Sequence, residues 1–101
     1  MRRIELDGSG WQSRRDFYDA LATALGSVGW HGRNADAFLE TMVYHCDLNS
    51  VQPPYEVVIE NAPDALRPFL CDFSSWVMEA RRDRRDDPGW GGDVQVAVTV
   101  A

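Results

Sequence analysis

Three segments of the chain alternate apolar and polar residues with a period of two, the pattern of a β-strand buried on one side. They are RIELD (3–7), YEVVIEN (55–61) and DVQVAVTV (93–100). The apolar positions that share a face are Ile4 and Leu6, then Tyr55, Val57 and Ile59, then Val94, Val96, Val98 and Val100. The alternate positions carry Glu, Asp, Gln and Thr. The pattern predicts three strands with one face toward a core and the other toward solvent.

Apolar residues at helical spacing predict three helices between these strands. Phe17, Leu21 and Leu25 mark the first helix, with Ser13 as its N-cap and Gly26 at its end. A second helix follows the N-cap Asn34, and its apolar face consists of Ala35, Phe38, Leu39, Met42 and Val43. After a loop over residues 45–54, the third helix begins at Pro68 and closes at RRDRRDD (81–87). Its core face consists of Phe69, Phe73, Trp76, Val77 and Ala80.

Strands that alternate with helices imply parallel pairing through right-handed crossovers. We expect residues 4–6, 56–60 and 94–100 to form one three-stranded parallel sheet. A sheet covered on both faces has continuous apolar strands, whereas these strands keep one polar side. The sequence therefore predicts a two-layer α/β fold with three helices on one face, as a single domain over residues 1–101.

The net charge of −6 argues against a nucleic-acid binder and against binding to an anionic membrane. The acidity is concentrated, because residues 34–79 contain eight acidic side chains and only Arg67 as a base. This distribution favours a cationic partner. Glu5 and Asp7 interrupt any signal peptide near the N-terminus, so we expect a cytoplasmic protein with Cys46 and Cys71 as free thiols.

The sequence offers little support for catalysis or for a metal. His31 could act as a base oriented by Asp36 or Glu40, but a loop histidine is the better interpretation because no nucleophile motif lies nearby. His31, His45, Cys46 and Cys71 lack the spacing of a zinc site. We therefore expect a non-enzymatic protein with no cofactor and no metal. Acids interleave the arginines of 81–87, which indicates a solvated helix end rather than a nucleic-acid patch.

Two features near the second helix have open interpretations. Asp36 and Glu40 lie four residues apart and so share a helix face, which is either solvated or a binding surface. Trp30 lies between Gly29 and His31 in a loop, where it is either a plug between helices or an exposed anchor of the kind found at interface hot spots. Composition alone weighs these two roles of Trp30 equally.

Four segments resemble the barstar family of ribonuclease inhibitors: SRRDFYDALATALG (13–26), GWHGRNADAFLETM (29–42), PPYEVVIENA (53–62) and WVMEA (76–80). The resemblance follows the strand–helix–helix–strand–helix–strand order of essentially the whole chain. Its most specific part is the aromatic-x-Gly-x-Asn-x-Asp-Ala segment that starts at Trp30. It implies a small α/β immunity protein that blocks the active site of a secreted guanyl-specific ribonuclease in a one-to-one complex, and that is a monomer when free.

The resemblance also implies a set of contacts with the partner. They are Trp30, His31, Gly32, Asn34, Asp36, Glu40, Tyr44 and Glu79. Trp30 and Asn34 would frame the surface, and the three acids would stand in for RNA phosphates against the enzyme's Arg, Lys and His. The chain departs from the family pattern at Arg33 and Glu40, which predicts a target other than barnase. The alternative is an interaction module of the same fold that binds a non-ribonuclease toxin or a regulatory partner.

Overall fold

The computed structural model describes residues 1–29 and 32–101 and brings the three predicted strands into one sheet. The strands are β1 (Arg2–Asp7), β2 (Tyr55–Glu60) and β3 (Val96–Val100), in the order β1-β2-β3. Both pairs are parallel, with Ile4 opposite Val57 and Val57 opposite Val98. The prediction of a three-stranded parallel sheet is confirmed.

The last strand begins two residues later than predicted, at Val96. The reason lies in the neighbouring strand, whose first residue, Tyr55, pairs with Val96 and follows Pro53 and Pro54. Proline has no backbone N–H and cannot donate a ladder hydrogen bond. The ladder between β2 and β3 therefore starts only at Val96.

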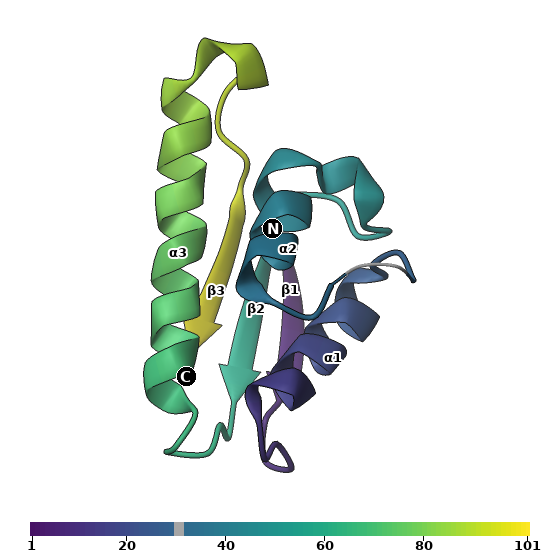
Figure 1. Cartoon of the computed structure of the whole chain (residues 1–101), viewed down its shortest axis with the longest axis vertical. Coiled ribbons are helices and arrows are strands. Elements are labelled where there is room, and N and C mark those ends of the chain that lie inside the picture. The colour runs from purple at the N-terminus through teal and green to yellow at the C-terminus, as the bar shows by residue number, and fades with distance from the viewer. Residues whose placement is uncertain (30–31) are drawn as a thin grey trace.

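The helices lie on one face of the sheet, as the polar alternate positions of the strands predict (Figure 1). They are α1 (Arg14–Leu25), α2 (Ala35–Leu39) and α3 (Arg67–Asp86), with short helical turns η1 (Glu40–Tyr44), η2 (Cys46–Leu48) and η3 (Pro88–Trp90). The opposite face of the sheet stays polar: Arg3 contacts Glu5 at 3.2 Å, and Thr99 donates to Glu56 at 2.9 Å. The two-layer α/β fold is confirmed. Of the helices in the described ranges, none has the length and hydropathy that a bilayer span requires.

Aromatic packing joins α1 to both α2 and α3. Phe17 of α1 is fully buried, with its ring 5.2 Å from that of Phe73 on α3. Tyr18 stacks on Phe38 of α2, with ring centroids 5.5 Å apart and planes 9° from parallel. Burying a large aromatic side chain stabilises a fold by roughly 1.5–3 kcal/mol. The position of α2, and of the acids it carries, is therefore set by the core.

The second helix begins as predicted but changes character halfway. The Asn34 Oδ1 atom caps it by accepting the Ala37 N–H at 2.8 Å. From Glu40 to Tyr44 the helix is a π turn rather than the α-helix that the pattern predicts, and the His45 N–H donates to the Glu40 carbonyl at 2.6 Å. The Thr41 hydroxyl donates to the Ala37 carbonyl one turn earlier, a contact that loosens an α-helical ladder.

The third helix begins at Arg67 rather than Pro68 and ends within the predicted RRDRRDD segment. The prediction of a wholly solvated helix end is wrong for Arg81 and Arg84, which are half-buried and bonded to backbone carbonyls. Arg82 and Arg85 are exposed. The spacing of the four arginines did not distinguish them, because the difference depends on the loop that returns over this helix end.

Three side chains of α3, seven residues apart, contact the outer edge of the sheet. Arg67 donates to the carbonyl of Ala101, Ser74 to that of Val98, and Arg81 to that of Val96. The backbone groups of Gln95 and Ala101 bond to β2. Successive residues of a strand direct their backbone groups to opposite sides, so the carbonyls of Val96 and Val98 point away from β2. Ser74 and Arg81 therefore satisfy β3 carbonyls that are not shared with β2, and Arg67 bonds to the residue that follows β3.

Candidate partner-binding groove

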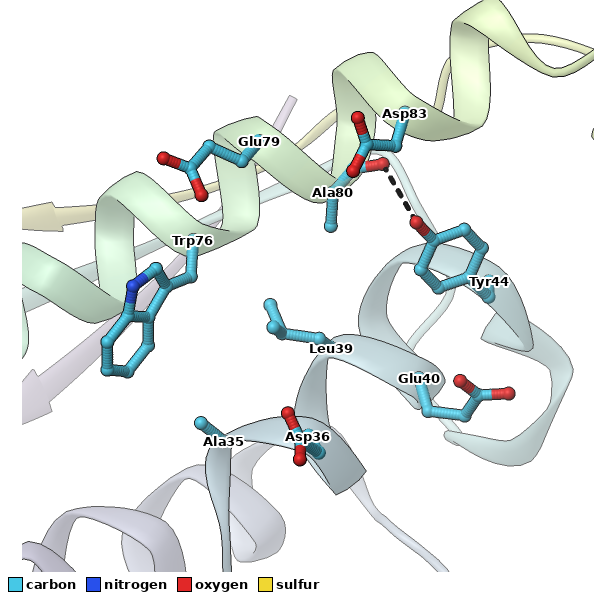
Figure 2. Close-up of a pocket in the computed structure, with 9 residues that line it drawn as sticks. All are labelled: Ala35, Asp36, Leu39, Glu40, Tyr44, Trp76, Glu79, Ala80 and Asp83. Atoms are coloured by element: carbon cyan, nitrogen blue, oxygen red, sulfur yellow. Dashed lines mark hydrogen bonds between the residues drawn. The ribbon is translucent and has the colours of Figure 1, made fainter.

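A groove of about 530 Å³ lies between the helix formed by α2 and η1 and the facing side of α3 (Figure 2). It is lined by Ala35, Asp36, Leu39, Glu40, Tyr44, Trp76, Glu79, Ala80 and Asp83. Four of the predicted contact residues are therefore brought together, namely Asp36, Glu40, Tyr44 and Glu79. The first three belong to α2 and η1, and Glu79 of α3 follows Tyr44 by 35 residues in the sequence.

Each wall of the groove carries a pair of carboxylates. Asp36 and Glu40 lie four residues apart on one wall, and Glu79 and Asp83 lie four residues apart on α3. All four side chains belong to exposed residues, and none of the described residues that line the groove is basic. Carboxylates of like charge gathered in one concave site create a negative potential that attracts cations.

Apolar side chains form the part of the groove between the acids. Leu39 and Trp76 are half-buried, and Figure 2 shows them on opposite walls. The Trp76 ring also packs edge-on against Phe69 at 6.1 Å. A partner side chain that enters the groove would meet apolar surface as well as charge, a combination typical of interface hot spots.

Tyr44 closes one end of the groove by bridging its walls. Its hydroxyl donates to the Ala80 carbonyl at 3.4 Å. Burial raises the pKa of Tyr44, and the nearby carboxylates of Asp83 and Glu40 raise it further. The phenol therefore stays protonated at neutral pH and remains a donor, without adding a fifth negative charge to the groove.

Glu40 contacts a second titratable side chain. Its Oε1 lies 2.9 Å from the Nε2 of His45, the residue directly after the π turn. The His45 ring in turn packs edge-on against Trp90 at 5.4 Å. Asp36 is placed differently, in the first turn of α2, where the N-terminal end of the helix attracts an acid.

Among the described residues, the predicted contacts Gly32 and Asn34 do not line this groove. Trp30 and His31 lie outside the described residues, so the two interpretations of Trp30 stay predictions. Gly32 and Asn34 are exposed beside α2, where Asn34 serves as the N-cap. A Cβ at position 32 would lie only 2.9 Å from the Asn34 amide nitrogen, so Gly32 allows the loop to pass close to this cap.

Asp83 and Trp76 line the groove although the sequence analysis did not predict either as a contact. Trp76 was expected in the core, but its side chain lies at the edge of the core and faces the groove. A usable signal for Asp83 existed, because Glu79 and Asp83 repeat the four-residue spacing of Asp36 and Glu40. Asp83 lies among four arginines in the sequence, so its charge was counted as balanced by theirs rather than as part of an acidic pair.

Other chemistry is sparse in the described part of the chain. Cys46 and Cys71 are both free thiols, and burial raises the pKa of Cys46. No group of three or more potential ligands among the described residues could hold a metal ion. The groove, by contrast, gathers four carboxylates from its two walls.

Comparison with known proteins identifies the family. A family model described as Barstar (barnase inhibitor) matches residues 1–87, which include both walls of the groove. A search of curated proteins found no match. The match covers most of the chain, and the α/β fold agrees with the resemblance to this family. This chain belongs to the barstar family of barnase inhibitors.

Proposed function

We propose that this protein inhibits a basic, barnase-like ribonuclease by occupying the enzyme's active site in a one-to-one complex. One observation carries this proposal: four carboxylates from two helices line a groove that has no basic residue among its described lining. Family membership supports the same class of partner, because the family is described as barnase inhibitors.

The groove would act as a mimic of RNA. A ribonuclease binds the phosphates of RNA with Arg, Lys and His side chains, and the same cations can bind the carboxylates of Asp36, Glu40, Glu79 and Asp83. Carboxylates accept bidentate hydrogen bonds from Arg, which adds geometric specificity to charge attraction. Substrate would then be excluded because its phosphate sites are taken.

The loop before α2 would extend this surface. Trp30, His31, Gly32 and Asn34 directly precede the acidic helix in the sequence, so a partner over the groove would reach them too. Arg33 lies in the same loop, and its Nε contacts Asp19 of α1 at 3.0 Å. We propose that the loop selects the target enzyme while the groove supplies the charge.

The biological setting that fits this activity is protection of the producing cell. We propose that the protein is cytoplasmic and, when free, monomeric, and that it neutralises a ribonuclease that is otherwise secreted. It would act by binding and not by catalysis.

Titration of guanyl-specific ribonucleases with the purified protein tests the proposed function. We expect RNA cleavage by a cognate enzyme to fall to zero at one molar equivalent. The alternative, a non-ribonuclease toxin or regulatory partner, would be favoured if cleavage by every barnase-like enzyme tested continued at a large excess of the protein.

A further inference from the structure

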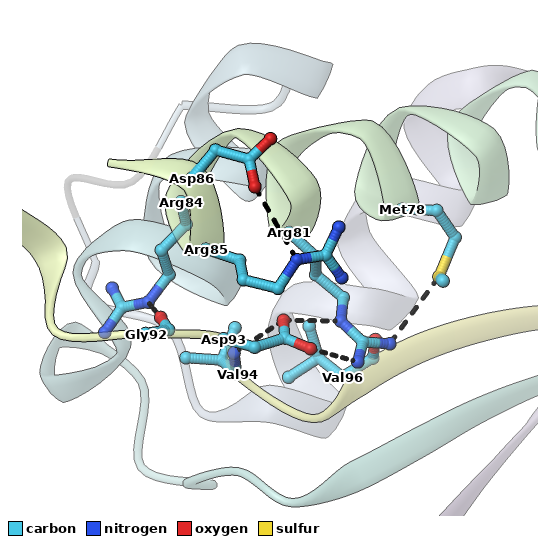
Figure 3. Close-up of polar contacts among 9 residues, drawn as sticks. All are labelled: Met78, Arg81, Arg84, Arg85, Asp86, Gly92, Asp93, Val94 and Val96. Atoms are coloured by element: carbon cyan, nitrogen blue, oxygen red, sulfur yellow. Dashed lines mark hydrogen bonds and ion pairs between the residues drawn. The ribbon is translucent and has the colours of Figure 1, made fainter. Parts of the chain in front are cut away.

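One side chain, Arg84 of α3, donates hydrogen bonds to four backbone carbonyls. Its Nη1 donates to Val43 at 3.0 Å and to Tyr44 at 3.2 Å. Its Nη2 donates to Trp90 at 3.0 Å. Its Nε donates to Gly92 at 2.8 Å, a bond that Figure 3 shows. All three guanidinium nitrogens are therefore used, which only the planar fork of Arg permits.

The acceptors belong to two segments that lie far apart in the sequence. Val43 and Tyr44 end the π turn that starts at Glu40. The last carbonyls of a helix lack partners within the helix, and a cation beside them is favourable. Trp90 and Gly92 belong to the turn between α3 and β3. Arg84 thus ties the end of the acidic helix to the opposite wall of the groove.

The turn after α3 is shaped to present its carbonyls to this guanidinium. Gly91 and Gly92 both have positive φ values, 79° and 111°, which residues with a Cβ rarely adopt. The Trp90 ring lies 5.8 Å from the Arg84 guanidinium carbon and 5.1 Å from the Tyr44 ring. The two glycines thus let the backbone wrap around Arg84 while Trp90 covers Tyr44.

We propose that Arg84 is a positioning residue for ribonuclease inhibition, which sets Glu40 and Tyr44 at the correct distance from Glu79 and Asp83. This role rests on the proposed inhibition of a ribonuclease. Arg84 is not among the residues that line the groove, so it acts through the helix end that it holds. Its neighbour Arg82, exposed on the same helix, provides a matched control.

The first arm of the test needs no ribonuclease. Arg84→Lys keeps the charge but loses the fork, so amide hydrogen exchange at His45, whose N–H closes the π turn, should accelerate about tenfold, whereas Arg82→Lys should leave it unchanged. Unchanged amide exchange at His45 in a folded Arg84→Lys protein would show that Arg84 does not hold the end of the π turn, whatever the protein binds. This arm therefore remains decisive even if wild type inhibits no ribonuclease.

The second arm is a double-mutant cycle on the inhibition constant. Arg84→Lys should weaken inhibition about tenfold, and its loss should overlap with that of Glu40→Gln, so that the double variant loses less than the product of the two factors. With Glu79→Gln, which lies on the wall that carries Arg84, the factors should multiply. If Arg84→Lys showed the same coupling with Glu40→Gln as with Glu79→Gln, Arg84 would stabilise the whole protein rather than position Glu40, and the proposal would be wrong. If Arg84→Lys folds too poorly to assay, Gly92→Ala, which disturbs a single acceptor, replaces it in both arms.

Discussion

The four groove carboxylates are close in space, yet each has different neighbours. Glu40 contacts His45, and Asp36 lies in the first turn of α2. Glu79 lies in the second half of α3 and Asp83 in its last turn. An exposed carboxylate with no partner contributes little to stability, so its replacement affects mainly the complex. The groove can therefore be tested one residue at a time.

Truncation of a groove acid should weaken inhibition far more than it weakens the fold. We expect Asp36→Ala, Glu40→Ala, Glu79→Ala and Asp83→Ala each to cost roughly 2–5 kcal/mol of binding, a magnitude drawn from buried charge pairs in complexes that include barnase–barstar itself. Each should change the free energy of unfolding by at most about 0.5 kcal/mol. Inhibition titrations and urea unfolding provide the two measurements.

Glu60→Ala is the matched control for this series. Glu60 carries the same charge on the polar face of the sheet, away from the helices, where Arg3 lies 3.6 Å away. Its loss should leave inhibition unchanged. If all four groove variants inhibit as well as Glu60→Ala, the carboxylates do not replace phosphates, and the loop around Trp30 must carry the contact.

At the residue scale, spacing along the sequence predicted some of the residues that line the groove and could not predict others. Asp36 and Glu40 share a helix face by periodicity alone, and this pair was identified. Trp76 could not be placed at the groove, because only the packing of α2 against α3 determines which part of its ring stays uncovered. Arg84 was missed for the same reason, since its four acceptors come from distant segments.

At the scale of elements, the ends of helices depend on single residues. Gly26 ends α1 with φ of 63°, and a Cβ there would lie 2.6 Å from the Cβ of Ser50. Gly91 has a similar φ of 79°, but a Cβ there would meet no atom within 4 Å. A substitution at Gly91 therefore introduces backbone strain alone, whereas one at Gly26 introduces backbone strain and a steric conflict with Ser50.

Gly26→Ala should destabilise the protein more than Gly91→Ala does. Backbone strain alone costs about 1–2 kcal/mol for a residue with a Cβ in the left-handed region, and Gly26→Ala adds the conflict with Ser50. Adding Ser50→Gly should recover part of the loss at position 26 and none at position 91. Urea unfolding of wild type, the two alanine variants and the two double variants with Ser50→Gly measures these free energies. Equal losses of unfolding free energy for Gly26→Ala and Gly91→Ala would contradict the steric conflict between position 26 and Ser50.

The link between α3 and the start of β3 should make stability depend on pH. Arg81 donates to both Asp93 oxygens, at 3.1 and 2.9 Å, and these bonds hold the pKa of Asp93 below its usual value of 3.8. The native state then binds fewer protons than the unfolded state at acid pH. The contribution to stability is complete above pH 3.8 and disappears as pH falls through the lower native pKa.

Asp93→Asn should therefore lower the free energy of unfolding at pH 7 and flatten its decline in acid. Urea unfolding at several pH values between neutral and about 2 would show both effects. Asp86→Asn is the control, because Asp86 meets Arg85 only at 3.8 Å on an exposed helix end. A variant at position 93 as stable as wild type at pH 7 would contradict this account.

The boundaries of elements were predictable where one residue sets them. Asn34 and Gly26 begin and end helices through contacts within a few residues of themselves. The π turn at Glu40 was not predictable, because α and π turns bury nearly the same apolar positions. The late start of β3 depends on Pro53 and Pro54, which act across the sheet rather than along the chain.

At the scale of the whole molecule, the charge of −6 and the acidic groove should direct the approach of a basic enzyme. Electrostatic steering is screened beyond about 8 Å at physiological ionic strength. We expect the association rate constant, measured by stopped flow, to fall steeply as salt rises, while the dissociation rate constant changes little. An association rate constant that stays the same from low to high salt would argue against an electrostatic encounter.

The contacts of Arg67, Ser74 and Arg81 with the outer edge of the sheet have a consequence for colloidal behaviour. An exposed strand edge is a template on which other chains polymerise into fibrils, and natural proteins block such edges. The carbonyls of Val96 and Val98 are occupied by α3, and the other edge strand presents the charged residues Arg3, Glu5 and Asp7. Both edges of the sheet are thereby protected from pairing with the strands of other chains.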